Sequence, residues 1–262
     1  MFLAFAISAF RTRIAYRSQV WALLFGVALE IFARVSIWTA VYGGNSVING
    51  VSLWQMVTYS VLAVALFSDW DSIELVRDVG ASIRSGDIVN QLLKPYAYPA
   101  SLFARTVGSK LSQVLLIGLP LIAVIAFAFG LVPPASLGHA LFFALLCLVS
   151  AAMIMAVGIV FGLLSFWVLD AHALEWFMRG FVAFLSGGFV PLWFFPPALS
   201  QIVALLPFSW IAYHPMAVYL GQVDLAGAGL TLLGGLAWLA VMVGVIGWLW
   251  SRTTGRLVVQ GG

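Results

Sequence analysis

Charged residues are scarce in this sequence. Only 8% of its 262 residues are Asp, Glu, Lys or Arg, whereas about a quarter of an average globular domain is charged. Hydrophobic residues make up 63%, and the mean hydropathy is +1.10. So few charges cannot cover a water-soluble surface, and the net charge of +3 gives no sign of nucleic-acid binding. The sequence therefore predicts an all-α, polytopic membrane protein with a single transmembrane domain over residues 1–262.

Motifs of common catalytic and nucleotide-binding sites are also lacking. The single cysteine, Cys147, lies in an apolar run, which excludes a disulfide framework and a cysteine metal cluster. No G-x-x-x-x-G-K-[ST] motif is present to hold nucleotide phosphates, and no H-E-x-x-H motif is present to hold a metal. The three histidines, His139, His172 and His214, are far apart. We expect no catalytic residue, no metal and no cofactor in this chain.

What the sequence does have is long apolar runs separated by turns and charges. The Asn49-Gly50 turn precedes one run, and Pro133-Pro134 ends another. The fourth run, of some 33 residues, exceeds the roughly 20 needed for one crossing, which indicates a tilted or overhanging helix. The runs predict six transmembrane helices, over about 20–42, 52–67, 111–131, 137–169, a fifth ending near 190, and 226–250.

Two further apolar segments differ from these spans. Residues 1–19 are apolar and carry three arginines, which is typical of a helix lying in the cytoplasmic membrane interface. Residues 191–222 are broken by five prolines, which indicates a re-entrant helical hairpin on the external side.

The placement of Lys and Arg predicts the orientation. With six crossings and a cytoplasmic N-terminus, every Lys and Arg except Arg34 is cytoplasmic, and the external segments 43–51, 132–136 and 191–225 contain none. Counting 199–221 as another span would place Arg252 and Arg256 outside. Both termini are therefore predicted to be cytoplasmic.

Residues 68–110 form the largest predicted cytoplasmic loop, and 10 of the charged residues lie between Asp69 and Lys110. Within this loop, residues 83–94 have helical amphipathic spacing and are followed by Pro95. The pattern predicts one short amphipathic helix. Either this helix docks on a partner, or the loop is a solvated linker between two spans.

Two ionisable residues, Glu30 and Arg34, lie within the first predicted span at i,i+4 spacing. Charges at such depth are costly and face the interior of the bundle or a cavity. Two interpretations stay open: a polar patch beside a substrate route, or a self-neutralising pair that also holds a neighbouring helix.

The order of these features, together with two groups of motifs, resembles the membrane subunits of the type-two ATP-binding-cassette exporter family. Ile83-Arg84-Ser85-Gly86 with Leu92-Leu93-Lys94-Pro95 is similar to the coupling segment of that family. The predicted hairpin resembles the family's external one through Ser186-Gly187, Pro191-Leu192, Phe195-Pro196, Leu206-Pro207-Phe208 and His214-Pro215.

The resemblance implies a permease in a bacterial cytoplasmic membrane that forms the export pathway as a dimer with an identical or homologous permease. Separate ATPase subunits would hold ATP and Mg. The small external region favours a lipid-like, hydrophobic or small cargo. Implied roles are ATPase coupling for Ile83, Arg84, Asp87, Ile88 and Leu92, the translocation pathway for Glu30 and Arg34, and an external gate for Pro191, Phe195, Pro207 and Phe208.

Two alternatives come from other classes. An ion-coupled secondary transporter would need no ATPase, but no internal repeat is visible to support it. A membrane-embedded lipid-modifying enzyme would need a polar constellation at one membrane face. The sequence offers for this only Asp170, His172, Glu175 and Arg179.

Overall fold

The computed structural model describes residues 17–67, 70–92, 98–168 and 171–260. Most of these residues are helical, and the strands among them form one short hairpin. The all-α prediction is confirmed. Of the interfacial helix predicted over residues 1–19, residues 1–16 lie outside the described residues.

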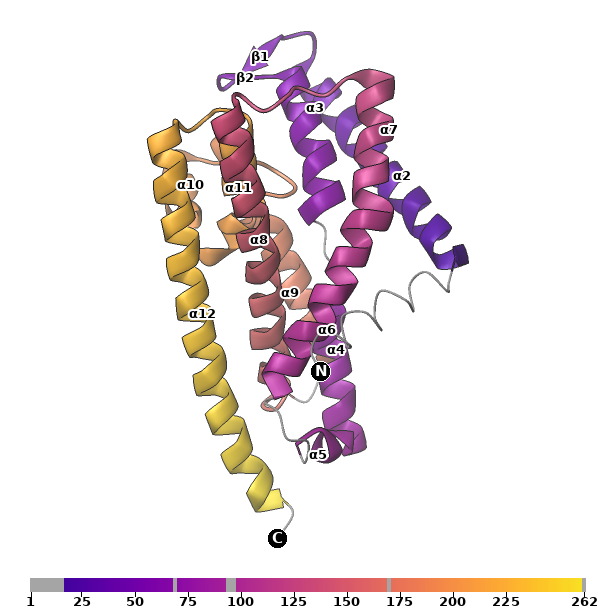
Figure 1. The fold of residues 1–262 in the computed structure, drawn as a ribbon, viewed down its shortest axis with the longest axis vertical. Coiled ribbons are helices and arrows are strands. Elements are labelled where there is room, and N and C mark those ends of the chain that lie inside the picture. Colours follow the sequence, from indigo (N-terminus) through magenta and orange to yellow (C-terminus); the bar gives the residue numbers. More distant parts are fainter. Residues whose placement is uncertain (1–16, 68–69, 93–97, 169–170, 261–262) are drawn as a thin grey trace.

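Four of the described helices are long and apolar enough to cross a membrane, which confirms a multi-pass membrane protein. In Figure 1, α12 runs along one side of the molecule next to α8, with which it is in contact. The four are α2 (Arg17–Tyr42), the helix made by α6 (Tyr98–Gln113), η2 (Val114–Gly118) and α7 (Leu119–Phe129), α8 (Leu137–Leu164), and α12 (Leu225–Gln260).

The other two predicted spans correspond to shorter helices. The second is α3 (Leu53–Leu62), ten residues long, continued by the five π-helical residues of η1 (Ala63–Phe67). The fifth is α9 (Ala171–Leu185), with 15 residues. A simple crossing needs about 20 residues, so these two crossings stay predictions.

Several predicted boundaries are wrong. The sequence predicts a fifth helix that follows the polar residues and ends near 190, but α9 already contains His172, Glu175 and Arg179 and ends at Leu185. Asp170 lies outside the described residues. α8 ends at Leu164 rather than at 169, and the helix that contains the third predicted span begins at Tyr98, within the predicted loop. Polar residues mark a membrane boundary only when water solvates them, whereas Glu175 is buried in α9 beside Arg179.

The predicted Asn49-Gly50 turn is confirmed. It joins β1 (Val47–Ile48) to β2 (Val51–Ser52) in an antiparallel pair. Asn49 and Gly50 have φ of 50° and 78°, as the favoured two-residue hairpin turn requires. Ser52 then begins α3 with a capping box, in which its hydroxyl accepts from the Gln55 N–H and the Gln55 side chain accepts from the Ser52 N–H.

The single amphipathic helix predicted over residues 83–94 is wrong, because two helices meet there. α4 (Trp70–Ser85) ends before Gly86, and α5 (Asp87–Leu92) begins after it. Gly86 has a φ of +78°, a left-handed conformation that glycine adopts without a steric penalty and that interrupts a helix. Hydrophobic periodicity continues across this corner, which is why the pattern alone suggested one helix.

Residues 191–222 fold as short helical pieces, as the prolines indicate. Pro197 and Pro207 each occupy a first helical position, where a missing N–H is harmless. The pieces are η3 (Leu192–Phe194), α10 (Pro197–Leu205), η4 (Pro207–Trp210) and α11 (Tyr213–Tyr219).

α8 forms the centre of the packed structure. It contacts α12, α4, α11 and α6, and its side chains Leu146, Met153 and Leu163 are fully buried. α12 packs beside it through the indole of Trp210, whose Nε1 donates to the Thr231 carbonyl at 2.8 Å. Because α4 also packs on α8 and α9, the helix that leads to the α4–α5 corner is part of the core.

The two π-helical segments, η1 and η2, contact each other. A Cβ added to Gly118 would lie 2.5 Å from the carbonyl oxygen of Ala65. That oxygen belongs to helical backbone and cannot move aside. Close packing of the second and third apolar helices therefore depends on glycine at this position.

Gly118→Ala should lower the thermal unfolding midpoint of the purified protein in detergent, because the added methyl group forces η1 and η2 apart. Overpacking of this kind costs about 1–3 kcal/mol. Tryptophan fluorescence during heating would measure the midpoint. The control is Gly244→Ala in α12, where an added Cβ meets no atom within 4 Å. Equal midpoints for the two variants would contradict this account.

Candidate functional site

Glu30 and Arg34 form an ion pair on α2, as one of the two open interpretations predicts. Arg34 Nη2 lies 2.7 Å from Glu30 Oε1, and Arg34 Nε donates to the same oxygen at 3.2 Å. The Arg34 side chain is 13% exposed and that of Glu30 34% exposed. The pair lowers the cost of holding two charges on an otherwise apolar helix.

Arg34 also reaches a second segment. Its Nη1 donates to the carbonyl of Gly188, which follows α9 in the chain. Its guanidinium carbon lies 4.9 Å from the ring centroid of Phe189, a cation–π distance. Arg34 therefore joins α2 to the Ser186–Phe189 turn.

Three consecutive carbonyls of this turn accept hydrogen bonds from three different segments. The Ser186 carbonyl accepts from the Tyr213 N–H at 2.9 Å. The Gly187 carbonyl accepts from the Tyr59 hydroxyl at 2.6 Å, and the Gly188 carbonyl accepts from Arg34. Sequence reasoning missed Tyr59, Tyr213 and Gly188 as partners, although it did single out the Ser186-Gly187 motif.

Gly187 has the conformation that this turn needs. Its φ is +71°, and an added Cβ would lie 2.9 Å from the Tyr213 Cβ. Both the left-handed backbone and the close approach of α11 therefore require glycine.

The predicted gate residues lie around this turn but do not form one cluster. Phe195 stacks on Phe184 at 5.1 Å between ring centroids, and Phe208 packs against Phe181 at 5.8 Å. Pro191 and Pro207 are buried. An apolar pocket of about 170 Å³ lies beside Phe195 and is also lined by Gly180, Ala183, Phe184, Phe189 and Val190.

The predicted coupling residues differ in exposure. Arg84 and Asp87 are exposed on either side of the Gly86 corner. Ile88 is 2% exposed and packs in a cluster that includes Leu102, and Ile83 packs against the same cluster. Leu92 ends α5, and its side chain is outside the described residues.

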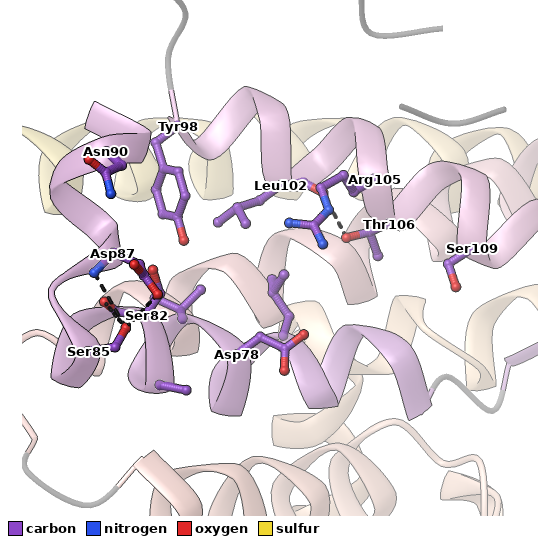
Figure 2. A pocket seen from close by; sticks show the side chains of 13 residues that line it. Asp78, Ser82, Ser85, Asp87, Asn90, Tyr98, Leu102, Arg105, Thr106 and Ser109 are labelled. Carbon is purple, nitrogen blue, oxygen red and sulfur yellow. Dashed lines mark hydrogen bonds between the residues drawn. The ribbon is translucent and has the colours of Figure 1, made fainter. Parts of the chain in front are cut away.

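A larger pocket, which the sequence did not reveal, lies between α4, α5 and α6. Its volume is about 720 Å³, within the range of ligand sites. Figure 2 shows polar side chains from all three helices around it. Among its lining residues are Asp78, Ser82, Asp87, Asn90, Tyr98 and Arg105.

Burial raises the pKa of the Asp78 carboxyl above its ordinary value. Arg77 and Arg105 lower that pKa, and the carboxylate of Glu175 raises it further. Burial is the largest of these causes, so the charged form of Asp78 is less favourable in the folded protein than in the unfolded chain. Burial is only partial, and Asp78 is exposed on the wall of this pocket.

The polar residues of α9 form their own pair. Arg179 Nη2 lies 2.8 Å from Glu175 Oε1, and the Glu175 side chain is 3% exposed. His172 Nδ1 lies 3.8 Å from the other carboxylate oxygen. The described residues contain no group of three or more His, Cys, Asp or Glu that could hold a metal. What α9 holds is a neutralised pair within one helix.

Comparison with known families gives one result that covers most of the chain. The family model described as ABC-2 family transporter protein matches residues 27–261. This match confirms the resemblance found in the sequence. A search of curated individual proteins gave no match.

Arg34→Gln should lower the thermal midpoint more than Glu30→Gln does, because only the first change removes the donor to Gly188. Leaving a buried acceptor unpaired costs about 1–3 kcal/mol. The double reversal Glu30→Arg with Arg34→Glu should recover the ion pair but place a carboxylate beside the Gly188 carbonyl. We therefore expect it to restore the midpoint only in part. Full recovery of the midpoint would show that the ion pair alone contributes to stability and that the hydrogen bond to Gly188 does not.

Proposed function

The chain belongs to the ABC-2 family of transporter proteins, a family of membrane permeases, and we propose that it works as a dimer coupled to separate ATPase subunits. The observation that carries this proposal is the family match over residues 27–261. The second permease is an identical or homologous chain, and ATP and Mg are held by the ATPase subunits.

The α4–α5 corner is the proposed docking site for the ATPase. In Figure 1, α5 lies at the end of the molecule where the C-terminus lies, and the β1–β2 hairpin lies at the opposite end. Arg84 and Asp87 are exposed there, so they can contact a partner. Ile88 and Ile83 serve as anchors, because they pack inside this chain. Leu92 remains a proposed contact.

The packing of α4 gives this corner a mechanical connection to the core. α4 contacts α8 and α9, and α9 leads directly into the Ser186–Phe189 turn. A push on the corner by the ATPase therefore reaches α9 through packed helices. We infer that Glu30 and Arg34 act beside the export route by holding this turn to α2, and that Pro191, Phe195, Pro207 and Phe208 close the external side.

The proposed topology has six crossings in a bacterial cytoplasmic membrane, with both termini cytoplasmic. The short helices α3 and α9 complete the four long ones. α10 and α11 form the re-entrant external hairpin, whose broken backbone is acceptable at that depth because it is packed within the protein. The described external part is small, which supports a lipid-like, hydrophobic or small cargo.

Cysteine labelling tests this topology in a Cys147→Ser background. A cysteine at Asn45 or Gln222 should react with a membrane-impermeant thiol reagent added outside intact cells, and one at Ser85 or Gln260 should react only after the cells are opened. Asn45, Gln222 and Ser85 are exposed, so accessibility within the protein does not limit labelling. External labelling at Gln260 would contradict the six-span topology.

Asp87→Arg should weaken association with the ATPase, because it reverses an exposed charge at the proposed docking corner. Contacts at the centre of an interface cost more than about 1 kcal/mol when disrupted, which is more than fivefold in affinity. Co-purification with a candidate ATPase subunit, followed by titration, would measure this association. Arg252→Asp, an exposed charge reversal on α12, is the control. If both variants bound the ATPase normally, the corner would be a linker.

A further inference from the structure

The pocket between α4, α5 and α6, here called the loop pocket, contains two opposite charges that the proposed coupling does not use. Asp78 lines it from α4 and Arg105 lines it from α6. They are close enough for Arg105 to affect the pKa of Asp78. Within the described part of the chain, neither side chain has an ion pair or a side-chain hydrogen bond.

Two other pairs of charged residues in the described part of the chain do form ion pairs. Glu30 with Arg34, and Glu175 with Arg179, are paired at 2.7 and 2.8 Å. Asp78 and Arg105 are instead exposed, and both face a shared space of about 720 Å³ (Figure 2). Such a space can accept a ligand that meets both charges.

The loop pocket also has an apolar side and a position near the membrane. Leu75, Val79 and Leu102 line it together with the polar groups. Along α6 it extends from Tyr98 to Ser109, which is roughly 16 Å at 1.5 Å per residue. The exposed apolar residue Leu111 follows at once. The pocket therefore begins among charges and ends where the apolar membrane-spanning part of the helix begins.

The charges select the ligand class. A simple anion would pair with Arg105 but leave the carboxylates of Asp78 and Asp87 unpaired, and a simple cation would leave Arg105 unpaired. A molecule that carries an ammonium group and a phosphate satisfies both, since a guanidinium binds phosphate in a bidentate manner and a carboxylate accepts from an ammonium. Ser82, Asn90 and Ser109 add hydrogen-bonding groups along the wall.

We propose that the loop pocket binds the zwitterionic headgroup of a phospholipid, with its ammonium group at Asp78 and its phosphate at Arg105. The acyl chains leave the pocket past Ser109 toward the exposed apolar surface that begins at Leu111. This inference adds a ligand to the proposed permease and does not depend on ATPase coupling, because binding can be measured with the permease alone.

The test uses the full-length chain in a non-ionic detergent, titrated with phosphatidylethanolamine that carries a fluorescent acceptor on an acyl chain. Energy transfer from tryptophan reports binding. Phosphatidylglycerol with the same label is the anionic comparison. We expect phosphatidylethanolamine to bind at least about fivefold more tightly, and Asp78→Asn and Arg105→Gln each to weaken its binding by about fivefold or more.

The two substitutions should have different effects on the binding of the anionic lipid, phosphatidylglycerol. Asp78→Asn should leave phosphatidylglycerol binding unchanged or tighter, because it removes a repulsive carboxylate, whereas Arg105→Gln should weaken it. Arg252 is an exposed arginine on α12, and Arg252→Gln should not change the binding of either lipid. Asp78→Asn keeps the shape of the side chain, and an unchanged thermal midpoint would show that it folds normally.

Four results would overturn the proposal. Equal binding of the two lipids would show that the pocket does not recognise a zwitterion. Phosphatidylethanolamine binding that is unaffected by Asp78→Asn and Arg105→Gln would place the lipid elsewhere. If unlabelled glycerophosphoethanolamine competed as well as the intact lipid, the ligand would be a soluble zwitterion. Loss of ATPase association in both variants, without any lipid binding, would assign the pocket to the ATPase interface.

Discussion

Backbone groups buried in an apolar environment must be hydrogen-bonded, and the Ser186–Phe189 turn shows how strongly this constraint acts here. α9 ends at Leu185, so the carbonyls that follow have no helical partner. Each of three successive carbonyls accepts from a different part of the chain, namely α2, α3 and the start of α11. Unsatisfied, each would cost several kcal/mol in a lipid environment. The turn is thus a junction that fixes the relative positions of three segments distant in sequence.

This junction explains why the first predicted span carries an arginine. α2 is otherwise poorly buried, with Trp21 and Phe25 each 72% exposed. Packing alone would hold it weakly against the rest of the molecule. The guanidinium supplies a long-range hydrogen bond and a contact with Phe189, while Glu30 neutralises its charge. Of the two interpretations that the sequence left open, the contacts match the self-neutralising pair that also holds a neighbouring segment.

Much of the fold could be predicted from the sequence, and the failures have a common physical cause. Apolar runs located the long helices because their signal is local, and Asn49-Gly50 located the hairpin because its turn conformation is nearly residue-specific. Gly86 was missed as a break because periodicity ignores backbone conformation. The start of α9 was misplaced because Glu175 is polar yet buried by pairing. The bonds of the turn and the loop pocket join residues from separate helices, and nothing in the linear order predicts those contacts.

In the described part of the chain, some carboxylates form an ion pair on their own helix, whereas Asp78 does not. Glu30 and Glu175 each have an arginine four residues later on the same helix, so each charge is neutralised before its helix packs. Such pairs are explained by folding alone. Asp78 has neighbours of both signs but no direct partner, and burial disfavours its charged form. Asp78 is exposed, as is Arg105, so water can solvate both charges and neither needs a partner within the protein. The distribution of partners, more than the positions of the charges in the sequence, thus distinguishes residues that hold the helices together from residues that line the loop pocket.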